Sequence, residues 1–210
     1  EIYRSFLADE PMLELLLEMR PAVVSFHFGL PQQDRIDALK AAGIVLFTTA
    51  TSLEEARQIE AAGIDVIVAQ GIEAGGHRGL FDPSAPDPAL PTFELLEQLR
   101  KEVSLPLVGA GGIMTGAHIR TAFHHGASAV QMGSAFIACP ESSAPPHHRA
   151  LIAQGGGLQT ALTAVISGRP ARGIVNQLFL EVGAEGHPPL PDYPIAYDAA
   201  KALHAAASSK

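Results

Sequence analysis

A histidine in a glycine-rich loop is the clearest candidate for chemistry in this sequence. The run Gln70-Gly71-Ile72-Glu73-Ala74-Gly75-Gly76-His77-Arg78-Gly79 follows an apolar segment, Ile64 to Ala69, that is typical of a buried strand. The imidazole of His77 titrates near neutral pH, so it can accept a proton or donate a hydrogen bond to a developing anion. A single histidine is more often structural, but the loops of parallel α/β enzymes converge at this end of the strands. The position therefore favours an active site.

Two glycine-containing turns predict a site for a phosphate group. Gly111 and Gly112 lie between a predicted strand and a predicted helix, where backbone N–H groups can reach an anionic oxygen. Gly133 and Ser134 occupy the same position one strand later, and the hydroxyl adds a donor. Either turn alone could need glycine for steric reasons, but two turns on successive strands favour phosphate binding. The dinucleotide-binding spacing Gly-x-Gly-x-x-Gly is incomplete, because its last position is Met114.

Three further polar side chains have two interpretations each. Gln70 and Gln131 end predicted strands, where an amide can either bind the edge of a heterocycle or hold a loop by hydrogen bonds. Glu73 is either a second acid or an anchor for Arg78 or for backbone N–H groups.

No metal site is predicted. The pairs His124-His125 and His147-His148 are adjacent in sequence, so on a helix their side chains diverge, and no cysteine or carboxylate set has ligand spacing. Cys139 has no catalytic context and is expected to be a small buried thiol.

The elements that must position these residues alternate between strands and helices, which is typical of a parallel sheet in an α/β fold. The joints at Gly43, Gly63 and Gly126 each end a predicted helix just before a strand. Strands are predicted at about 22–28, 44–50, 64–69, 106–110 and 129–132, and helices at about 5–19, 34–42, 52–63, 92–103 and 116–125.

Five such strands could form an open doubly wound sheet or part of a (β/α)8 TIM barrel. The phosphate site of TIM barrels uses the loops after strands seven and eight. Because the glycine turns follow the last two strands here, the five strands are interpreted as strands 4 to 8 of a barrel.

The βα alternation stops after Pro140. Helices are predicted at about 146–154 and 158–166, where they could form a cap over the site, and a proline-rich stretch leads to an Ala-rich helix that wraps the outside or frays. The predicted organisation is a partial TIM barrel over residues 1–140, a helical substrate-cap segment over 141–180, and a C-terminal tail packing on the barrel over 181–210.

Composition limits the class of protein. The 210 residues are 47% hydrophobic, and the net charge of −8 comes without a basic stripe, which argues against a nucleic-acid partner. One cysteine cannot form an internal disulfide, and no signal-peptide or membrane-length apolar segment is found, so the expected location is cytoplasmic, with no membrane partner. The sequence begins at Glu1 without an initiator methionine, and we expect it to be a fragment.

Several motifs, taken in order, resemble the nitronate monooxygenase family, formerly called 2-nitropropane dioxygenases. The resemblance spans roughly residues 20 to 180. The motifs are Phe26-His27-Phe28-Gly29, the run from Gln70 to Gly79, Gly109-Ala110-Gly111-Gly112-Ile113-Met114-Thr115-Gly116, Gln131-Met132-Gly133-Ser134-Ala135-Phe136 continuing to Pro140-Glu141-Ser142, and Ser167-Gly168-Arg169-Pro170-Ala171-Arg172-Gly173.

The resemblance implies a (β/α)8 enzyme with FMN as cofactor, so that residues 1–140 would form an FMN-binding domain. Gln70 and Gly75 would contact the flavin, Gly112 its phosphate, and the segment from Gln131 to Ser134 the phosphate and nearby atoms. The implied cofactor-binding residues are Gln70, Gly75, Gly76, Gly111, Gly112, Gln131, Met132, Gly133 and Ser134.

The resemblance also implies an activity: the family oxidises alkyl nitronates, such as the toxic propionate 3-nitronate, with FMN and O2 and without a metal. His77 would be the active-site histidine, either holding the anionic nitronate or deprotonating a nitroalkane. Residues 167–173 would border the substrate entrance, and Arg169 or Arg172 could attract the anion.

The family's N-terminal strands, with an early asparagine loop that contacts the flavin, have no counterpart in this sequence. We therefore expect an open barrel with one exposed edge strand. The missing N-terminal portion, or self-association into a homo-oligomer, would complete it.

Two alternatives stay open at this stage. One is an NAD(P)H-dependent flavin oxidoreductase of the same barrel type that acts on quinones or enoyl thioesters, although the run from Glu73 to Gly79 favours the nitronate interpretation. The other is a non-catalytic half-barrel that serves in assembly or ligand binding.

Overall fold

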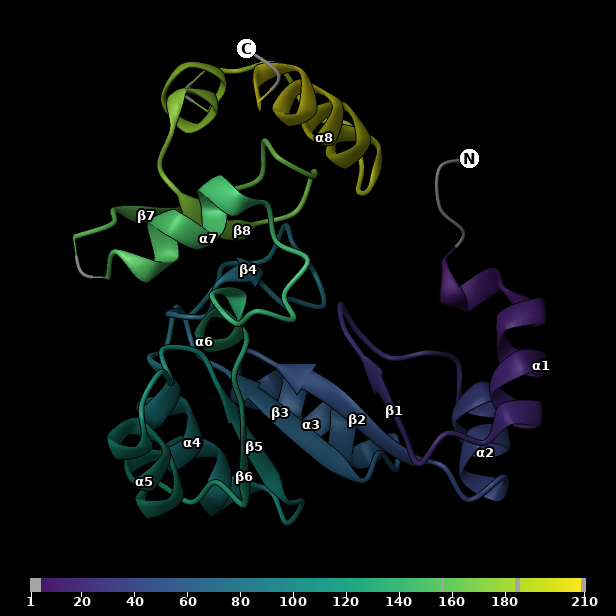
Figure 1. Cartoon of the computed structure of the whole chain (residues 1–210). Helices are drawn as coiled ribbons and strands as arrows, with labels where there is room; N and C mark the ends of the chain where they lie inside the picture. Colours follow the sequence, from purple (N-terminus) through teal and green to yellow (C-terminus); the bar gives the residue numbers. More distant parts are fainter. Residues whose placement is uncertain (1–4, 156, 184–185, 209–210) are drawn as a thin grey trace. The chain divides into compact units, whose positions relative to one another are not determined.

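The chain folds into two compact units (Figure 1). A computed structural model describes residues 5–155, 157–183 and 186–208. We call residues 5–74 and 79–132 the parallel-sheet unit. Residues 75–78 and the described residues from 133 onward form the histidine unit. Each unit is described by itself.

The parallel-sheet unit contains five strands that all run in the same direction. Their order across the sheet, β1-β2-β3-β5-β6, follows the order of the chain without a reversal. A doubly wound sheet reverses its strand order at a switch point, so this arrangement favours a barrel-type progression. The strands are β1 (Val23–Phe26), β2 (Val45–Ala50), β3 (Val66–Gln70), β5 (Leu107–Ala110) and β6 (Ala129–Gln131), each at a predicted position.

The helices of this unit begin and end at the residues that the sequence indicated. The Ser52 hydroxyl accepts a hydrogen bond from Glu55 N at 3.2 Å, and Gly43, Gly63 and Gly126 have φ of +81°, +77° and +99°. The helices are α1 (Glu10–Met19), α2 (Gln33–Ala41), α3 (Leu53–Ala61), α4 (Thr92–Glu102) and α5 (Gly116–His124), after a short 3₁₀ turn, η1 (Phe6–Ala8). The predicted helix at 5–19 is divided between η1 and α1 because Asp9 caps α1 by accepting from Met12 N.

One face of the parallel sheet packs on the helices. Leu46, Ile67 and Leu107 of the sheet are buried in one cluster with residues of α2, α3, α4 and α5. On the other face, Val68, Val108 and Ala110 are buried, whereas Val23 and Val45 are 45% and 40% exposed. This second face is therefore only partly covered by the described residues of its own unit.

The histidine unit is built around a small antiparallel sheet of order β4-β8-β7. These strands are β4 (Gly76–His77), β7 (Thr160–Thr163) and β8 (Ala171–Ile174). The helical elements are α6 (Ser134–Ile137), α7 (Pro146–Ala153), the π-helical turn η2 (Leu178–Val182) and α8 (Ile195–Ser208).

The predicted helix at 158–166 is wrong. Residues Thr160 to Thr163 form strand β7 instead, because β8 supplies antiparallel partners from Ile174 back to Ala171. The β-branched threonines fit this pleated surface, and the pairing comes from a segment that local periodicity does not include. The predicted helix at 146–154 is confirmed as α7, whereas strands β4 and β8 were not predicted.

The predicted division at residues 140 and 180 stays a prediction. Within the described ranges, no helix has the length and apolar character needed to cross a membrane.

Candidate active site

His77 lies on the short strand β4, where pairing with β8 fixes its backbone. His77 is opposite Ala171 in the antiparallel register, and Arg78 N donates to Pro170 O at 2.8 Å. The imidazole Nε2 lies 2.8 Å from the Ser167 hydroxyl, so the ring is also held through its side chain.

Ser167 connects the imidazole to the turn that precedes β8. Its side chain is fully buried, at 0% exposure. The hydroxyl oxygen lies 3.1 Å from Arg169 O and accepts from Arg169 N at 3.3 Å. The serine is therefore the centre of a small hydrogen-bond network, although the sequence indicated only that it borders the substrate entrance.

The surroundings of His77 favour its neutral form. Burial of the ring lowers the pKa of His77 below its ordinary value of 6.5, and the positive charge of Arg169 lowers it further. At neutral pH the imidazole is uncharged, which is the state that can accept a proton.

Two tyrosines surround the imidazole edge-on. The ring centroid of His77 lies 5.4 Å from that of Tyr193 and 5.8 Å from that of Tyr197, with interplanar angles of 81° and 89°. Lys201 Nζ lies 4.9 Å from the centroid of the Tyr197 ring. Tyr193 and Tyr197 of this tail therefore lie against His77, while the packing of the tail on the barrel stays a prediction.

The approach of Tyr193 depends on a glycine. Gly168 has φ of +88°, and a Cβ there would lie 2.4 Å from Pro191 O and 2.9 Å from Tyr193 N. Sequence reasoning missed both tyrosines and Lys201. The i, i+4 spacing of Tyr197 and Lys201, which puts them on one face of a helix, was the signal that could have found them.

A cavity of about 910 Å³ lies in the histidine unit beside the ring of Tyr197. Tyr197, whose ring packs on His77, lines it, as does Ile166, the neighbour of Ser167. Its lining combines apolar and basic side chains: Pro145, Pro146, His147, His148, Ile166, Tyr197, Ala200, Lys201, His204 and Ala205.

The two predicted substrate arginines differ. Arg169 acts on the pKa of His77 through its charge. Arg172 Nη1 lies 3.2 Å from Thr160 Oγ1 and 3.4 Å from Thr160 O, so its guanidinium binds the neighbouring strand. A role of either residue in attracting substrate stays a prediction.

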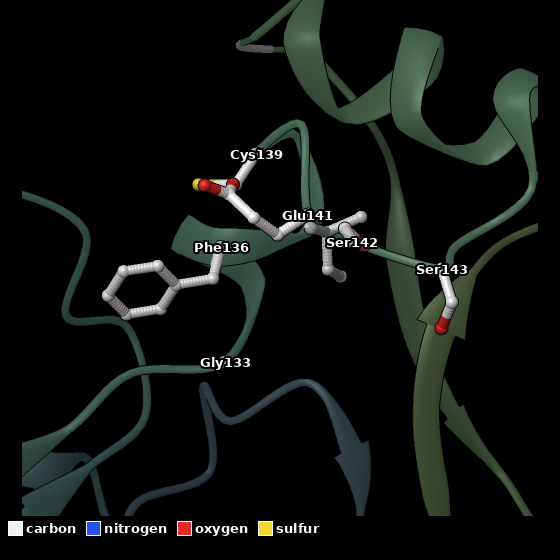
Figure 2. A pocket seen from close by; sticks show the side chains of 7 residues that line it. Gly133, Phe136, Cys139, Glu141, Ser142 and Ser143 are labelled. Atoms are coloured by element: carbon white, nitrogen blue, oxygen red, sulfur yellow. The ribbon is translucent and has the colours of Figure 1, made fainter.

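Predicted cofactor residues of the histidine unit lie close to one another. A Cβ on Gly75 would meet the Ser134 hydroxyl at 3.0 Å, and the Cβ position of Gly76, with φ of +78°, is open. The Cβ position of Gly133 is open as well. Gly133 also lines a hollow of about 720 Å³ along the α6 segment, where Phe136, Cys139, Glu141, Ser142 and Ser143 are labelled in Figure 2.

In the parallel-sheet unit, the two glutamines predicted to bind cofactor, Gln70 and Gln131, lie in register with each other across the sheet. Gln70 pairs in register with Ala110, and Ala110 pairs with Gln131, so both amides are at the carboxyl edge. Gln70 is buried, and its Oε1 accepts from Gly79 N at 2.8 Å. Gln70 therefore does hold the loop, while its contact with a flavin stays a prediction.

Glu73 is an anchor for backbone in this structure. Its Oε2 accepts from Thr92 N and from Thr92 Oγ1, both at 3.0 Å, at the start of α4, where Pro91 supplies no side-chain cap. Gly111 and Gly112 pack on this arrangement: a Cβ on Gly111 would lie 2.9 Å from Thr92 Oγ1, and one on Gly112 would lie 3.2 Å from Glu73 Cβ.

A second carboxylate, that of the buried Glu55, fixes the loop that leaves Gly79. The sequence assigned it only to a capping box, but its side chain accepts from Thr51 N at 2.6 Å, Thr51 Oγ1 at 2.7 Å and Phe81 N at 2.8 Å. Among the residues that the structure describes, no group of three or more histidine, cysteine or acidic side chains could hold a metal ion.

Comparison with known proteins decides the family. The profile of the family "Nitronate monooxygenase" matches residues 3–210. The chain belongs to the nitronate monooxygenase family. A nitronate monooxygenase of Pseudomonas aeruginosa is 54% identical over 209 residues, covering 100% of this chain and 60% of the relative, and one of Paraburkholderia phytofirmans is 56% identical over 211 residues, covering 100% and 57%.

Solved structures extend this result to the fold. A nitroalkane oxidase from Streptomyces ansochromogenes matches with a TM-score of 0.87 and 41% identity, covering 94% of this chain and 56% of that one. FabK from Thermotoga maritima matches with a TM-score of 0.71 and 31% identity, covering 85% and 54%. The chain thus spans about three-fifths of the length of the curated relatives it matches.

Within this nitronate monooxygenase family chain, the residues expected to bind cofactor are divided between the two units. Gln70, Gly111, Gly112, Gln131 and Met132 belong to the parallel-sheet unit, and Gly75, Gly76, Gly133 and Ser134 to the histidine unit. The chain passes directly from one group to the other at Met132 and Gly133.

Proposed function

We propose that the protein to which this chain belongs oxidises alkyl nitronates with O2, using FMN, and so detoxifies nitro compounds. The observation that carries the proposal is a neutral imidazole, His77, held by the buried Ser167 beside a cavity with basic side chains, in a chain of this family. A cytoplasmic location belongs to the same proposal.

The glycine turns fit a phosphate-bearing cofactor. Gly111 and Gly112 have φ of +114° and +66°, which side chains other than glycine adopt at a cost, and Gly133 leaves its Cβ position open. In the parallel-sheet unit, the backbone N–H groups at Gly111 and Gly112 are donors that suit a phosphate; in the histidine unit, the Ser134 hydroxyl is another such donor. FMN would supply the electron acceptor for nitronate oxidation.

A complete (β/α)8 barrel is the fold that we propose for the full-length protein. The strand order follows the chain, and a parallel sheet is ordinarily covered on both faces, whereas Val23 and Val45 are partly exposed on one face here. The greater length of the relatives supports further strands that cover this face.

The cavity supports a small anionic substrate. Lys201 contributes a positive charge to its lining, while Tyr197 and Ile166 contribute apolar surface. His77 would accept a proton from an acidic carbon or position the nitronate, and the tyrosine rings would limit where its imidazole can move.

The test is anaerobic mixing of the purified FMN-loaded protein with propionate 3-nitronate and, separately, with NADH. We expect the nitronate to bleach the flavin absorbance and subsequent O2 to restore it. Bleaching by NADH and not by the nitronate would support the flavin reductase alternative. A folded protein that retains no FMN and turns over neither compound would support the non-catalytic alternative.

A further inference from the structure

The contacts of Ser167 restrict where the proton of neutral His77 can reside. The Ser167 hydroxyl has three polar neighbours: Arg169 N at 3.3 Å, Arg169 O at 3.1 Å and His77 Nε2 at 2.8 Å. A backbone N–H only donates and a backbone carbonyl only accepts, whereas an imidazole nitrogen does either, depending on the tautomer.

Only one arrangement satisfies all three contacts. The hydroxyl has a single proton, and if that proton is donated to Arg169 O, the oxygen can accept from both Arg169 N and a protonated Nε2 of His77. If the proton is instead donated to Nε2, the contact with Arg169 O has no proton. The two oxygens would then face each other without a proton between them, and because Ser167 has 0% exposure, bulk water does not reach its hydroxyl.

We propose that Ser167 is a positioning residue that fixes His77 in the Nε2–H tautomer. The basic nitrogen of the ring is then Nδ1. Tyr193 and Tyr197 pack on the ring and Arg169 provides the nearby positive charge, so the imidazole keeps both its orientation and its neutral state.

This tautomer has a consequence for the reaction, and the consequence rests on the proposed function. With the Nε2 proton committed to Ser167, His77 acts as a proton acceptor through Nδ1 and does not hold the nitronate by donating a hydrogen bond from that nitrogen. Anchoring of the anion is then left to cationic side chains such as Lys201 in the cavity.

The experiment is two-dimensional proton–nitrogen NMR of the histidine rings in the full 210-residue chain with nitrogen-15 histidine, above pH 7, with His77 assigned by its loss in His77→Gln. We expect a protonated-type signal for Nε2 and an unprotonated-type signal for Nδ1 of His77. In Ser167→Ala we expect the Nδ1–H tautomer to become populated.

The matched control is Thr163→Val. Like Ser167, Thr163 has a hydroxyl that accepts from the backbone N–H two residues further along the chain, here Val165 N at 3.3 Å, but this hydroxyl does not contact His77. We expect this variant to keep the Nε2–H tautomer. A protonated Nδ1 in the unmodified chain, or an unchanged tautomer in folded Ser167→Ala, would overturn the proposal. The tautomer of His77 in the unmodified chain tests the proposal even if the Ser167 variant does not fold. Neither the measurement on the unmodified chain nor that on the variant requires FMN or turnover, so the test remains valid if the proposed function is wrong.

Discussion

The two units of this chain use their buried polar side chains differently. In the parallel-sheet unit, the buried side chains of Gln70 and Glu55, like the exposed side chain of Glu73, accept from backbone N–H groups that begin helices or hold loops. In the histidine unit, the buried hydroxyl of Ser167 instead contacts a titratable imidazole whose pKa is lowered.

This difference indicates that the polar side chains of the parallel-sheet unit stabilise the fold, whereas those around His77 take part in chemistry. A carboxylate that accepts from backbone N–H groups is committed to folding, whereas an imidazole kept neutral in a partly buried site is available for proton transfer. We therefore expect substitutions in the parallel-sheet unit to change stability first, and those around His77 to change titration and turnover first.

The largest effect on stability is expected from Gly71→Ala. A Cβ at this position would lie 2.0 Å from Thr92 Oγ1 and 2.3 Å from Thr92 N, so α4 or the loop has to shift. We expect the free energy of unfolding to fall by about 3 kcal/mol or more, measured by urea denaturation. The control Gly116→Ala, whose Cβ would meet nothing within 4 Å, should leave it nearly unchanged.

Thr92→Val tests the buried hydroxyl that joins Glu73 to the glycine turn. Thr92 is 1% exposed, and its hydroxyl lies 3.0 Å from Glu73 Oε2 and 2.9 Å from Gly111 O. Loss of these contacts should lower the free energy of unfolding by about 1–3 kcal/mol in denaturant titrations. Thr121→Val, which removes an exposed hydroxyl from α5, is the control, and equal losses in both variants would refute the scaffold role.

The pKa of His77 offers a test that should leave stability largely unchanged. The positive charge of Arg169 is the second cause, after burial, that lowers this pKa below 6.5. In Arg169→Met the pKa should rise toward 6.5, and because activity needs the neutral ring, the acid limb of kcat/KM should move to higher pH. Arg169→Lys retains the charge and should leave the acid limb of the kcat/KM profile at the same pH. An acid limb that moves equally in both variants would argue against the charge of residue 169 as a cause of the lowered pKa of His77.

The smallest effect is expected at the surface of the parallel-sheet unit. Glu60 Oε1 accepts from the Ser104 hydroxyl at 2.6 Å and from Ser104 N at 2.7 Å, and these bonds lower the pKa of Glu60 below 4.5. The stabilisation is present above pH 4.5 and is lost as the pH falls through the lowered pKa.

Glu60→Gln should therefore reduce the free energy of unfolding at pH 7 by less than about 1 kcal/mol and weaken its acid dependence. Thermal denaturation between pH 3 and pH 7 measures both changes. An acid dependence identical to that of the unmodified chain would exclude this contribution.

The parallel-sheet unit was predictable because its signals are local. Apolar runs mark the five strands, Ser52 begins α3, and Gly43, Gly63 and Gly126 end helices at positive φ. The histidine unit depends on pairings between distant segments, such as β4 with β8, so the helix predicted at 158–166 was wrong.

The same distinction applies to the candidate site. His77 was predictable from its place after a strand, but its partners Ser167, Tyr193 and Tyr197 lie about 90 or more residues further along the chain, and only tertiary structure brings them to the ring. Glu73 had two interpretations in the sequence, and its contact with Thr92 N supports the anchor.

The most direct test compares His77→Asn with Glu73→Gln in the FMN-loaded protein, with flavin absorbance and O2 uptake on propionate 3-nitronate both measured. We predict that His77→Asn retains flavin and loses about 10²- to 10⁴-fold in turnover, whereas folded Glu73→Gln keeps its turnover. Full turnover in His77→Asn, or an equal loss in a folded Glu73→Gln, would contradict the assignment of the chemistry to His77.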